Sequence, residues 1–334
     1  MMKKLTILLV AMLFTAGMAF AQDNSADTNQ SGNNNEAEVE QTGMSNTAEA
    51  SQTGNQNDAY IQQGNFGGGA VQSNFAEADI EQIGNQNDAT ISQRQGFSSG
   101  TAVSEHYIYQ DGLRNEASLT TFNGGNFGDI EQLGNDNWAK GRQSVGSDND
   151  VQVYQDGNTN RADVNQLGSE NALSDISQVG NANETTVDQS ATSGNAQFLE
   201  NTTGNNNNVT GVQYSTWAKV DLLINGNQNT VDTEQDRTGK ASMDFYGNSN
   251  TMTVFQGFDR NEIGSTVTGN SNVITVNQYG INNDIVLDGS GHWDRDGVDI
   301  LGNNNTVTID QLSDMNRASS VIDGNGNTSA INQN

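Results

Sequence analysis

Side chains that could catalyse a reaction or bind a metal ion are few in this sequence. The 334 residues include no cysteine and two histidines, His106 and His292, which lie far apart and have no nearby nucleophile motif. The densest group of candidate ligands is DGSGHWDRDG, residues 288–297. This stretch lacks the spacing and closing glutamate of an EF-hand loop and the nonapeptide of calcium β-rolls. We predict no catalytic residue, no metal site and no cofactor.

Carboxylates are abundant but form no recognisable catalytic pair. Asp and Glu number 41 against 13 Lys and Arg, which gives a formal net charge of −28. Two carboxylates could serve a polysaccharide-active β-helix enzyme, yet most occupy positions where polar residue types interchange. We favour a solvated face and rank the enzyme third among the possible functions. The acidic excess also disfavours nucleic acid or anionic lipid as a partner.

The amide side chains of Asn and Gln recur at fixed spacing, which favours hydrogen-bonded ladders over catalysis. Aligned on glycine, the sequence repeats the pattern G-N-x-N-x-A-x-V-x-Q. Copies span residues 32–41, 54–63, 84–93, 134–143, 146–155, 157–166 and 180–189. The glutamines Gln132, Gln143, Gln155, Gln166, Gln178 and Gln189 fall 11 or 12 residues apart. Such regularity indicates a repeat architecture.

Each copy alternates strictly between two kinds of residue, which is the period of a β-strand. One face carries Asn, small or aliphatic residues and Gln, and the other carries acidic residues, Thr, Ser or Lys. The junction Q-x-G-N-x-N supplies the turn, because Gly and Asn tolerate the positive φ of a tight corner. One such strand cannot bury its inner face, so neighbouring copies must stack.

Two 11-residue halves joined by turns make a 22-residue rung with two facing strands. Rungs stacked at roughly 4.8 Å align the inward Asn and Gln, so that each amide bonds the next one along the stack. We therefore predict an all-β fold. It is a β-solenoid of two facing parallel sheets with a thin, partly polar, amyloid-like core.

From Gly204 onward, the clean copies recur about every 22 residues. They span residues 226–235, 247–256, 269–278, 302–311 and 324–333. The strands between them carry an aliphatic or aromatic residue two positions before the glycine, where the first half has Gln. These residues are Ile224, Phe245, Val267, Ile300 and Ile322. We expect a drier core in this section.

The predicted self-assembly ladder consists of the inward amides. Its asparagines are Asn35, Asn57, Asn87, Asn137, Asn160, Asn183, Asn229, Asn250, Asn272, Asn305 and Asn327. Its glutamines are Gln41, Gln63, Gln93, Gln143, Gln166, Gln189, Gln235, Gln256, Gln278, Gln311 and Gln333. The predicted turn glycines are Gly54, Gly84, Gly134, Gly157, Gly180, Gly226, Gly247, Gly269, Gly302 and Gly324.

Residues 1–21 have the features of a secretory signal peptide. A basic region at Lys3 and Lys4 precedes an apolar run and the small-residue site Ala19-Phe20-Ala21. We predict cleavage before Gln22 and export of the mature chain, with no membrane-spanning segment in it.

The remaining sequence divides into four parts. Residues 22–31 lack the strand pattern and are predicted to form a flexible leader. The 11-residue half-repeats occupy 32–189. An irregular break at 190–203 precedes a second solenoid section over 204–334.

The signal peptide, the G-x-x-N turns and the strands of the form Q-x-G-x-x-N-x-A-x-V-x-Q together resemble the curlin repeat proteins. These are secreted subunits of curli, the functional amyloid of bacterial biofilms. The resemblance covers most of 32–189 and every second strand of 204–333. It implies export across the outer membrane through a secretion pore, then templated addition to a surface fibre begun by a nucleator subunit. The alternate C-terminal strands depart from the family by lacking Gln, which leaves open the role of main subunit or nucleator.

Self-assembly also has a physical basis in the sequence. No proline interrupts any strand, and the last unit, GNGNTSAINQN, reads as an uncapped strand. Unpaired strand edges invite another copy to add. We predict a non-enzymatic subunit of extracellular fibres for adhesion and biofilm matrix, with its own copies as partner. The alternative is a surface β-solenoid adhesin that binds carbohydrate or protein. Trp138, Trp217 and Trp293 could stack on a polysaccharide, but we favour a packing role.

Overall fold

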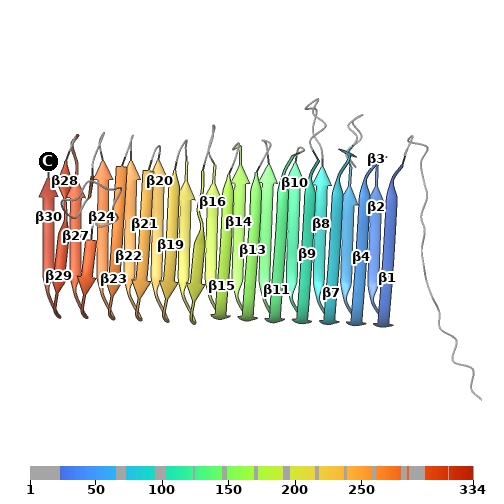
Figure 1. Cartoon of the computed structure of the whole chain (residues 1–334), viewed down its shortest axis with the longest axis horizontal. Helices are drawn as coiled ribbons and strands as arrows, with labels where there is room; N and C mark the ends of the chain where they lie inside the picture. The colour runs from blue at the N-terminus through green and yellow to red at the C-terminus, as the bar shows by residue number, and fades with distance from the viewer. Residues whose placement is uncertain are drawn as a thin grey trace, which may run out of the picture.

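The computed structural model describes residues 23–64, 73–94, 103–122, 125–144, 149–168, 172–190, 196–214, 218–236, 239–257, 261–279, 284–285, 298–314 and 316–333. The predicted signal peptide, residues 288–297, Trp217 and Trp293 lie outside these ranges. Within them the chain is all β-structure. Its strands stand side by side in one long stack that the chain follows from end to end (Figure 1).

Two long parallel sheets make up the stack, and each takes alternate strands along the chain. The 15-stranded first sheet contains β1 (Ser25–Asn33), β4 (Thr47–Asn55), β7 (Glu77–Asn85), β9 (Glu105–Leu113), β11 (Phe127–Asn135), β13 (Asp150–Asn158), β15 (Leu173–Asn181), β17 (Glu200–Thr203), β19 (Lys219–Asn225), β21 (Gly239–Tyr246), β23 (Asn261–Thr268), β25 (Asp284–Ile285), β26 (Val298–Leu301), β28 (Arg317–Ala318) and β29 (Ser320–Asp323).

The 13-stranded second sheet contains β2 (Glu36–Gln41), β5 (Asp58–Gln63), β8 (Asp88–Arg94), β10 (Glu116–Phe122), β12 (Trp138–Ser144), β14 (Arg161–Leu167), β16 (Glu184–Gln189), β18 (Asn208–Gln213), β20 (Thr230–Asp236), β22 (Thr251–Gly257), β24 (Val273–Tyr279), β27 (Thr306–Gln311) and β30 (Thr328–Gln333). A short pair, β3 (Gly43–Met44) and β6 (Ser73–Asn74), forms a separate 2-stranded sheet.

Register is strict, because each strand pairs with the equivalent residues of the next rung. In the second sheet Ala59 pairs with Ala89 and Gln63 with Gln93. Burial alternates along β5, where every second side chain is buried, as the period of two requires. The predicted class, an all-β solenoid of two facing parallel sheets, is confirmed.

The predicted flexible leader is wrong over most of its length. Ser25–Asn33 forms β1, which pairs with β4 along all of its residues. The physical reason lies in its ending, because Gln30, Gly32 and Asn33 repeat the Q-x-G-N junction even though the aliphatic residues are missing. The amide and corner positions are therefore enough to place the strand on the stack.

The break at 190–203 does not separate two stacks. Strand β17 pairs with β15 on one side and β19 on the other, so the first sheet runs through. The second sheet continues directly from β16 to β18. The stretch stays irregular, since Leu199 has a φ of 39°, and its Phe198 is fully buried. Room for that ring comes from Gly211, where a Cβ would lie 2.1 Å from the Phe198 ring.

The two edges of the solenoid differ in regularity. The corner that leads from a first-sheet strand to a second-sheet strand keeps one length, Gly-x-x-Asn, in rung after rung. The return connection varies, because Ser25 pairs with Thr47 but Thr47 pairs with Glu77, 30 residues on. Most inserted sequence therefore lies at one edge, and the constant corner forms the other. The exception falls within the first sheet, where Ile285 and Val298 pair with Ile263 and Ser265 of the single strand β23.

Glycine is required at the constant corner for two reasons. Gly134 has a φ of 106°, which L side chains rarely adopt. A Cβ there would also lie 2.0 Å from the carbonyl oxygen of Gly157 in the next rung. Close stacking of one corner on the next therefore excludes any side chain.

The interior between the sheets is apolar along its centre. Ala and Ile alternate in the first rungs, as at Ala59 and Ile61, both with no exposed area. In the later rungs Ile224, Phe245 and Val267 are also fully buried. These are the slots where the sequence replaces Gln by an apolar residue.

We expect Gly134→Ala to destabilise the solenoid by about 2 kcal/mol or more, because it combines positive φ with a steric clash. The matched control is Gly326→Ala. Gly326 has a φ of 69°, a Cβ added to it would meet no atom within 4 Å, and the same corner position holds Ala182 in another rung. The control is expected to change the urea unfolding midpoint little. Equal midpoints for the two variants would contradict the stacking argument.

Candidate functional site: the amide ladders

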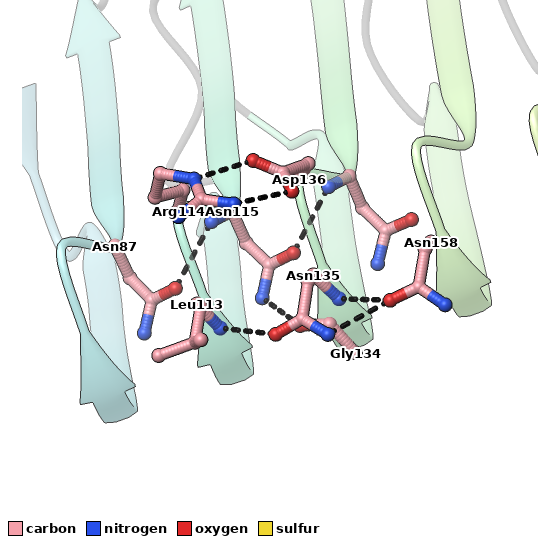
Figure 2. A network of polar contacts seen from close by, with 9 residues as sticks. Asn87, Leu113, Arg114, Asn115, Gly134, Asn135, Asp136 and Asn158 are labelled. Atoms are coloured by element: carbon pink, nitrogen blue, oxygen red, sulfur yellow. Dashed lines mark hydrogen bonds and ion pairs between the residues drawn. The ribbon is translucent and has the colours of Figure 1, made fainter.

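The inner asparagines of the corner form a buried ladder. The backbone N–H of Asn115 donates to Oδ1 of Asn87 at 3.0 Å, and its Nδ2 donates to the carbonyl oxygen of Gly134 at 2.8 Å (Figure 2). Each inner Asn therefore joins three rungs, because its backbone N–H donates to the Asn side chain of the preceding rung, and its own side chain both accepts from and donates to the backbone of the following rung. This geometry satisfies amides that would be costly to bury alone.

A second, exposed asparagine ladder runs along the same corner. Nδ2 of Asn135 donates to Oδ1 of Asn158 at 2.8 Å, and the backbone N–H of Asn135 donates to the same oxygen at 3.2 Å (Figure 2). Sequence reasoning assigned this Asn only a turn role. The signal that could have found the ladder is its recurrence directly after the glycine.

Glutamines of the second sheet form a buried ladder in which every amide donates in the same direction along the stack. Nε2 of Gln63 donates to Oε1 of Gln93 at 2.9 Å, and so on from lower to higher residue numbers. The same Nε2 donates to the carbonyl oxygen of Thr47, at the start of the facing first-sheet strand, at 2.9 Å. Each Gln thus joins neighbouring rungs and also ties the two sheets together.

A parallel glutamine ladder in the first sheet was missed as a site. It contains Gln30, Gln52, Gln82, Gln110, Gln132, Gln155 and Gln178. It ends where Gln178 donates to Oγ1 of Thr185 at 2.8 Å. Beyond that point the slot is Thr202 and then apolar. The early rungs are therefore held by two glutamine ladders and the later rungs by one.

The structure brings the predicted residues together in three rows. All the predicted asparagines lie in the inner Asn ladder, which Asn115 and Asn207 complete. All the predicted glutamines lie in the second-sheet Gln ladder, which Gln213 joins. All the predicted glycines occupy the corner with positive φ. That these rows drive assembly stays a prediction.

The exposed Asn ladder is interrupted at one rung. Leu113 takes the Asn position, with 39 % of its surface exposed. Because it has no side-chain amide, only its backbone N–H donates to Oδ1 of Asn135, at 3.2 Å. The next residue compensates, because Arg114 forms a two-point ion pair with Asp136 of the following rung, at 2.6 and 2.7 Å (Figure 2). An ionic link here replaces the amide link.

The second-sheet Gln ladder is interrupted at the same rung by Thr121. The gap is bridged from the first sheet by His106, which is fully buried. Nε2 of Gln93 lies 2.6 Å from Nδ1 of His106, and Nε2 of His106 lies 2.5 Å from Oγ1 of Thr121. Thr121 in turn donates to Oε1 of Gln143 at 3.1 Å. If His106 is neutral with its proton on Nε2, each group in this row donates to the next, from Gln93 through His106 and Thr121 to Gln143.

Burial keeps His106 neutral and lowers its pKa to about 4. The ring takes a slot that Ala78 and Gly128 fill in the adjoining rungs. A Cβ on Gly128 would lie 2.7 Å from the ring, so glycine there makes room for it. His106, Thr121 and Gly128 therefore form one compensated set.

A buried carboxyl group stands just past the end of the first-sheet Gln ladder. Glu200 occupies the slot of Ile176 in the neighbouring rung, and Thr202 donates to its Oε1 at 2.5 Å. Burial raises the pKa of Glu200 to about 7, against the opposing hydrogen bonds of Thr185 and Thr202. Sequence reasoning missed both Glu200 and His106, although the same alternation that makes Gln110 and Thr202 inward also marks these two residues as inward.

Other candidate sites gain no support from the geometry. Among the described residues, no group of three or more His, Cys, Asp or Glu side chains is arranged to hold a metal ion. Trp138 lies on the outward side of β12, where the Arg161 guanidinium is 3.7 Å from its ring centroid. Within the described ranges, no helix has the length and apolarity to cross a membrane.

A family model agrees with these repeats. The model of the curlin associated repeat matches residues 21–54, 125–157 and 146–174. The chain contains curlin associated repeats over these residues. The first match begins before β1, which agrees with the placement of that strand on the stack. No curated protein matches the curlin-repeat protein significantly.

Leu113→Asn should repair the exposed ladder of the curlin-repeat protein. The new amide can accept from Asn85 and donate to Asn135, for a gain of about 1 kcal/mol. Leu113→Ala is the control, because it removes the exposed apolar side chain without adding an amide. Urea unfolding measures both variants. A gain no larger for Leu113→Asn than for Leu113→Ala would show that the exposed ladder does not stabilise the stack.

His106 should make the protein acid-sensitive. The unfolded chain binds a proton below about pH 6.5, whereas the folded chain keeps His106 neutral down to about pH 4. The folded state therefore loses up to about 3 kcal/mol as the pH falls through that window.

The double variant His106→Ala/Thr121→Gln rebuilds the residues of the adjoining rungs and should remove this loss. Urea unfolding from pH 7 to pH 4 gives the free energy of unfolding of wild type and of the double variant. The difference between the two proteins cancels the contributions of the other titrating groups. His106→Ala alone leaves the ladder broken and should be destabilised at every pH. A difference between wild type and the double variant that does not change with pH would contradict the assignment.

Proposed function

We propose that the curlin-repeat protein is a structural subunit that adds head to tail to further copies of itself, forming extracellular amyloid fibres for adhesion and biofilm matrix. Curlin repeats occur in extracellular curli subunits and do not define an enzyme family. The observation that carries the proposal is the match between the two ends of the stack. Secretion through an outer-membrane pore and a separate nucleator subunit belong to the same proposal.

Both ends of the second sheet present an open strand edge. Among the described residues, no strand pairs with the outer edge of β2 or of β30. Their inward residues correspond one to one, since β2 reads EAEVEQ and β30 reads TSAINQ. A second copy placed in the existing register would stack Val39 on Ile331 and Gln41 on Gln333. Both aliphatic side chains are only partly buried in the single chain.

The polarity of the ladders selects head-to-tail addition. Gln311 Nε2 donates to Gln333 Oε1 at 2.9 Å, and as in the rest of this ladder the donor belongs to the rung with the lower residue numbers. At a junction, Gln333 of one copy would donate to Gln41 of the next. A head-to-head contact would instead set acceptor against acceptor. Direction is therefore built into the stack.

The corner ladders also continue across such a junction. Nδ2 of Asn303 donates to Oδ1 of Asn325 at 3.0 Å, so Asn325 would donate in the same way to Asn33 of the next copy. In the inner ladder the backbone N–H of Asn57 donates to Oδ1 of Asn35. By the same geometry, the N–H of Asn35 would donate to Asn327 of the preceding copy.

The edge of β30 provides the test of the junction. The N–H of Thr306 donates to the carbonyl oxygen of Asn327 at 2.9 Å, and the N–H of Leu312 donates to that of Gln333 at 2.8 Å. The backbone N–H groups of outward-facing residues therefore point toward the rung with the higher residue numbers. By this alternation the N–H of Ala330 points away from β27, toward the next copy. Ala330→Pro removes that donor while leaving the pairing of β30 with β27 intact, because edge strands accept proline.

The mature chain is purified denatured, diluted, and followed by thioflavin fluorescence, electron microscopy and fibre diffraction. Wild type should give seeded fibres with a meridional reflection near roughly 4.7 Å. Ala330→Pro should slow seeded growth about tenfold or more, and Ala330→Thr, which keeps the N–H, should grow as wild type does. A folded, thioflavin-silent monomer would refute the function. Unimpeded growth of Ala330→Pro would refute this junction.

A further inference from the structure

One face of the second sheet gathers positive charge in a strongly acidic protein. Four of the 13 Lys and Arg lie on strands β8, β12 and β14, and β10 between β8 and β12 carries Phe122. The cation–aromatic patch consists of Arg94, Phe122, Trp138, Lys140, Arg142 and Arg161. All six lie outside the core, and Arg94 and Arg142 are exposed.

Aromatic rings hold the cations of this patch in place. The guanidinium groups of Arg94 and Arg142 lie 5.6 and 5.8 Å from the ring centroid of Phe122, one from each neighbouring strand. Arg161 lies 3.7 Å from the ring centroid of Trp138 and is ion-paired with Asp163 and Glu184, each at 3.4 Å. Ring contacts orient the guanidinium groups without neutralising them, so the net positive charge of the patch comes from Arg94, Lys140 and Arg142. The patch is therefore an ordered positive surface.

The first sheet presents the opposite charge on the same rungs. Strands β7, β9, β11, β13 and β15 contain no Lys or Arg. The acidic face consists of the outward carboxylates of these strands. These are Glu77, Asp79, Glu81, Glu105, Asp111, Asp129, Glu131, Asp150, Asp156 and Asp175.

Carboxylates on the acidic face are stacked against one another by the strict register. Glu77 pairs directly with Glu105, and Glu49 pairs with Asp79. Like charges in this position are destabilising. Partial burial and the neighbouring Glu49, Glu81 and Glu77 raise the pKa of Asp79 to about 6. A cationic partner laid on this face would relieve that repulsion.

We propose that the cation–aromatic patch of one copy docks on the acidic face of a second copy lying beside it, with the two solenoid axes parallel. The charges are complementary, and the two surfaces occupy the same rungs on opposite sides of the stack. Copies placed side by side without axial shift therefore bring them face to face. This lateral contact adds to the proposed axial fibre but does not require it.

The repeat spacing favours a second copy over an anionic polymer. Rows of charge on the patch and on the acidic face follow one rung spacing, because both are set by the same stacked strands. Their contacts therefore stay in register over several rungs. Because patch and acidic face are different surfaces, the contact is heterologous and can repeat from copy to copy. Such repetition would gather fibres into flat bundles.

The test reverses charge on the patch with Lys140→Glu/Arg142→Glu in the full mature chain. Lys219→Glu/Lys240→Glu is the matched control, since it makes the same change in net charge on strands outside both surfaces. Sedimentation of the folded soluble chain measures lateral association before any fibre forms. Electron microscopy of fibre width measures it afterwards, and thioflavin kinetics measure axial growth separately.

The patch variant should weaken soluble association by more than about tenfold and give single narrow fibres, with axial growth unchanged. The control should behave as wild type. Mixing the patch variant with Asp129→Lys/Glu131→Lys should restore association between the two variants. Association equal to that of the control, or no restoration on mixing, would overturn the proposal. Loss of binding to an anionic polysaccharide with bundling unchanged would also overturn it. Absence of fibres in all proteins would refute the axial function alone.

Discussion

The constraint on which the structure depends is the pairing of identical amides in neighbouring rungs. A buried Gln or Asn needs a donor and an acceptor nearby, and the same residue one rung away provides both. Gln63 and Gln93 meet at 2.9 Å only because their strands are parallel and in register. A slip of two residues, which keeps the same side chains inward, would leave Gln93 beside Ile61 instead of Gln63. The ladders therefore set the register that an apolar core of Ala, Ile and Val alone would specify weakly.

Each interruption of a ladder is compensated by residues in adjoining rungs. His106 fills the gap left by Thr121 and finds its space at Gly128, while Glu200 is held by Thr185 and Thr202. The two buried groups respond to pH in opposite ways. His106 costs stability as the pH falls from about 6.5 to about 4, and Glu200 costs stability as it rises from about 4.5 to about 7. Their effects oppose each other where these windows overlap.

The sequence predicts what repeats within a single rung, and it fails where the cause lies between rungs. Alternation and the Q-x-G-N junction indicate the strands, the corner glycines and the inward amides of the second sheet. The exposed ladder through Asn135 and Asn158 is visible only once corners stack. Strand β1 reads as a leader because it lacks aliphatic residues, whereas its register follows from Gln30 and the corner. Alternation with Ile108 and Gln110 marks His106 as inward, but its bridging role cannot be predicted from sequence, since its partners come from the neighbouring strands β8, β10 and β12.

The change in core chemistry along the stack makes its two ends unequal. At the start of the first sheet Gln30 occupies the amide slot, but at the far end the same slot is Ile322, which is buried. In a head-to-tail junction the first-sheet Gln ladder would therefore stop, while the second-sheet Gln ladder and both corner ladders continue. At each junction the side-chain oxygen of Gln30, which begins the ladder, would face Ile322 and gain no donor, at a cost of about 1–3 kcal/mol if water cannot reach it. Junctions between copies are then weaker than the contacts between rungs, so a fibre under stress would separate between subunits and leave each solenoid folded.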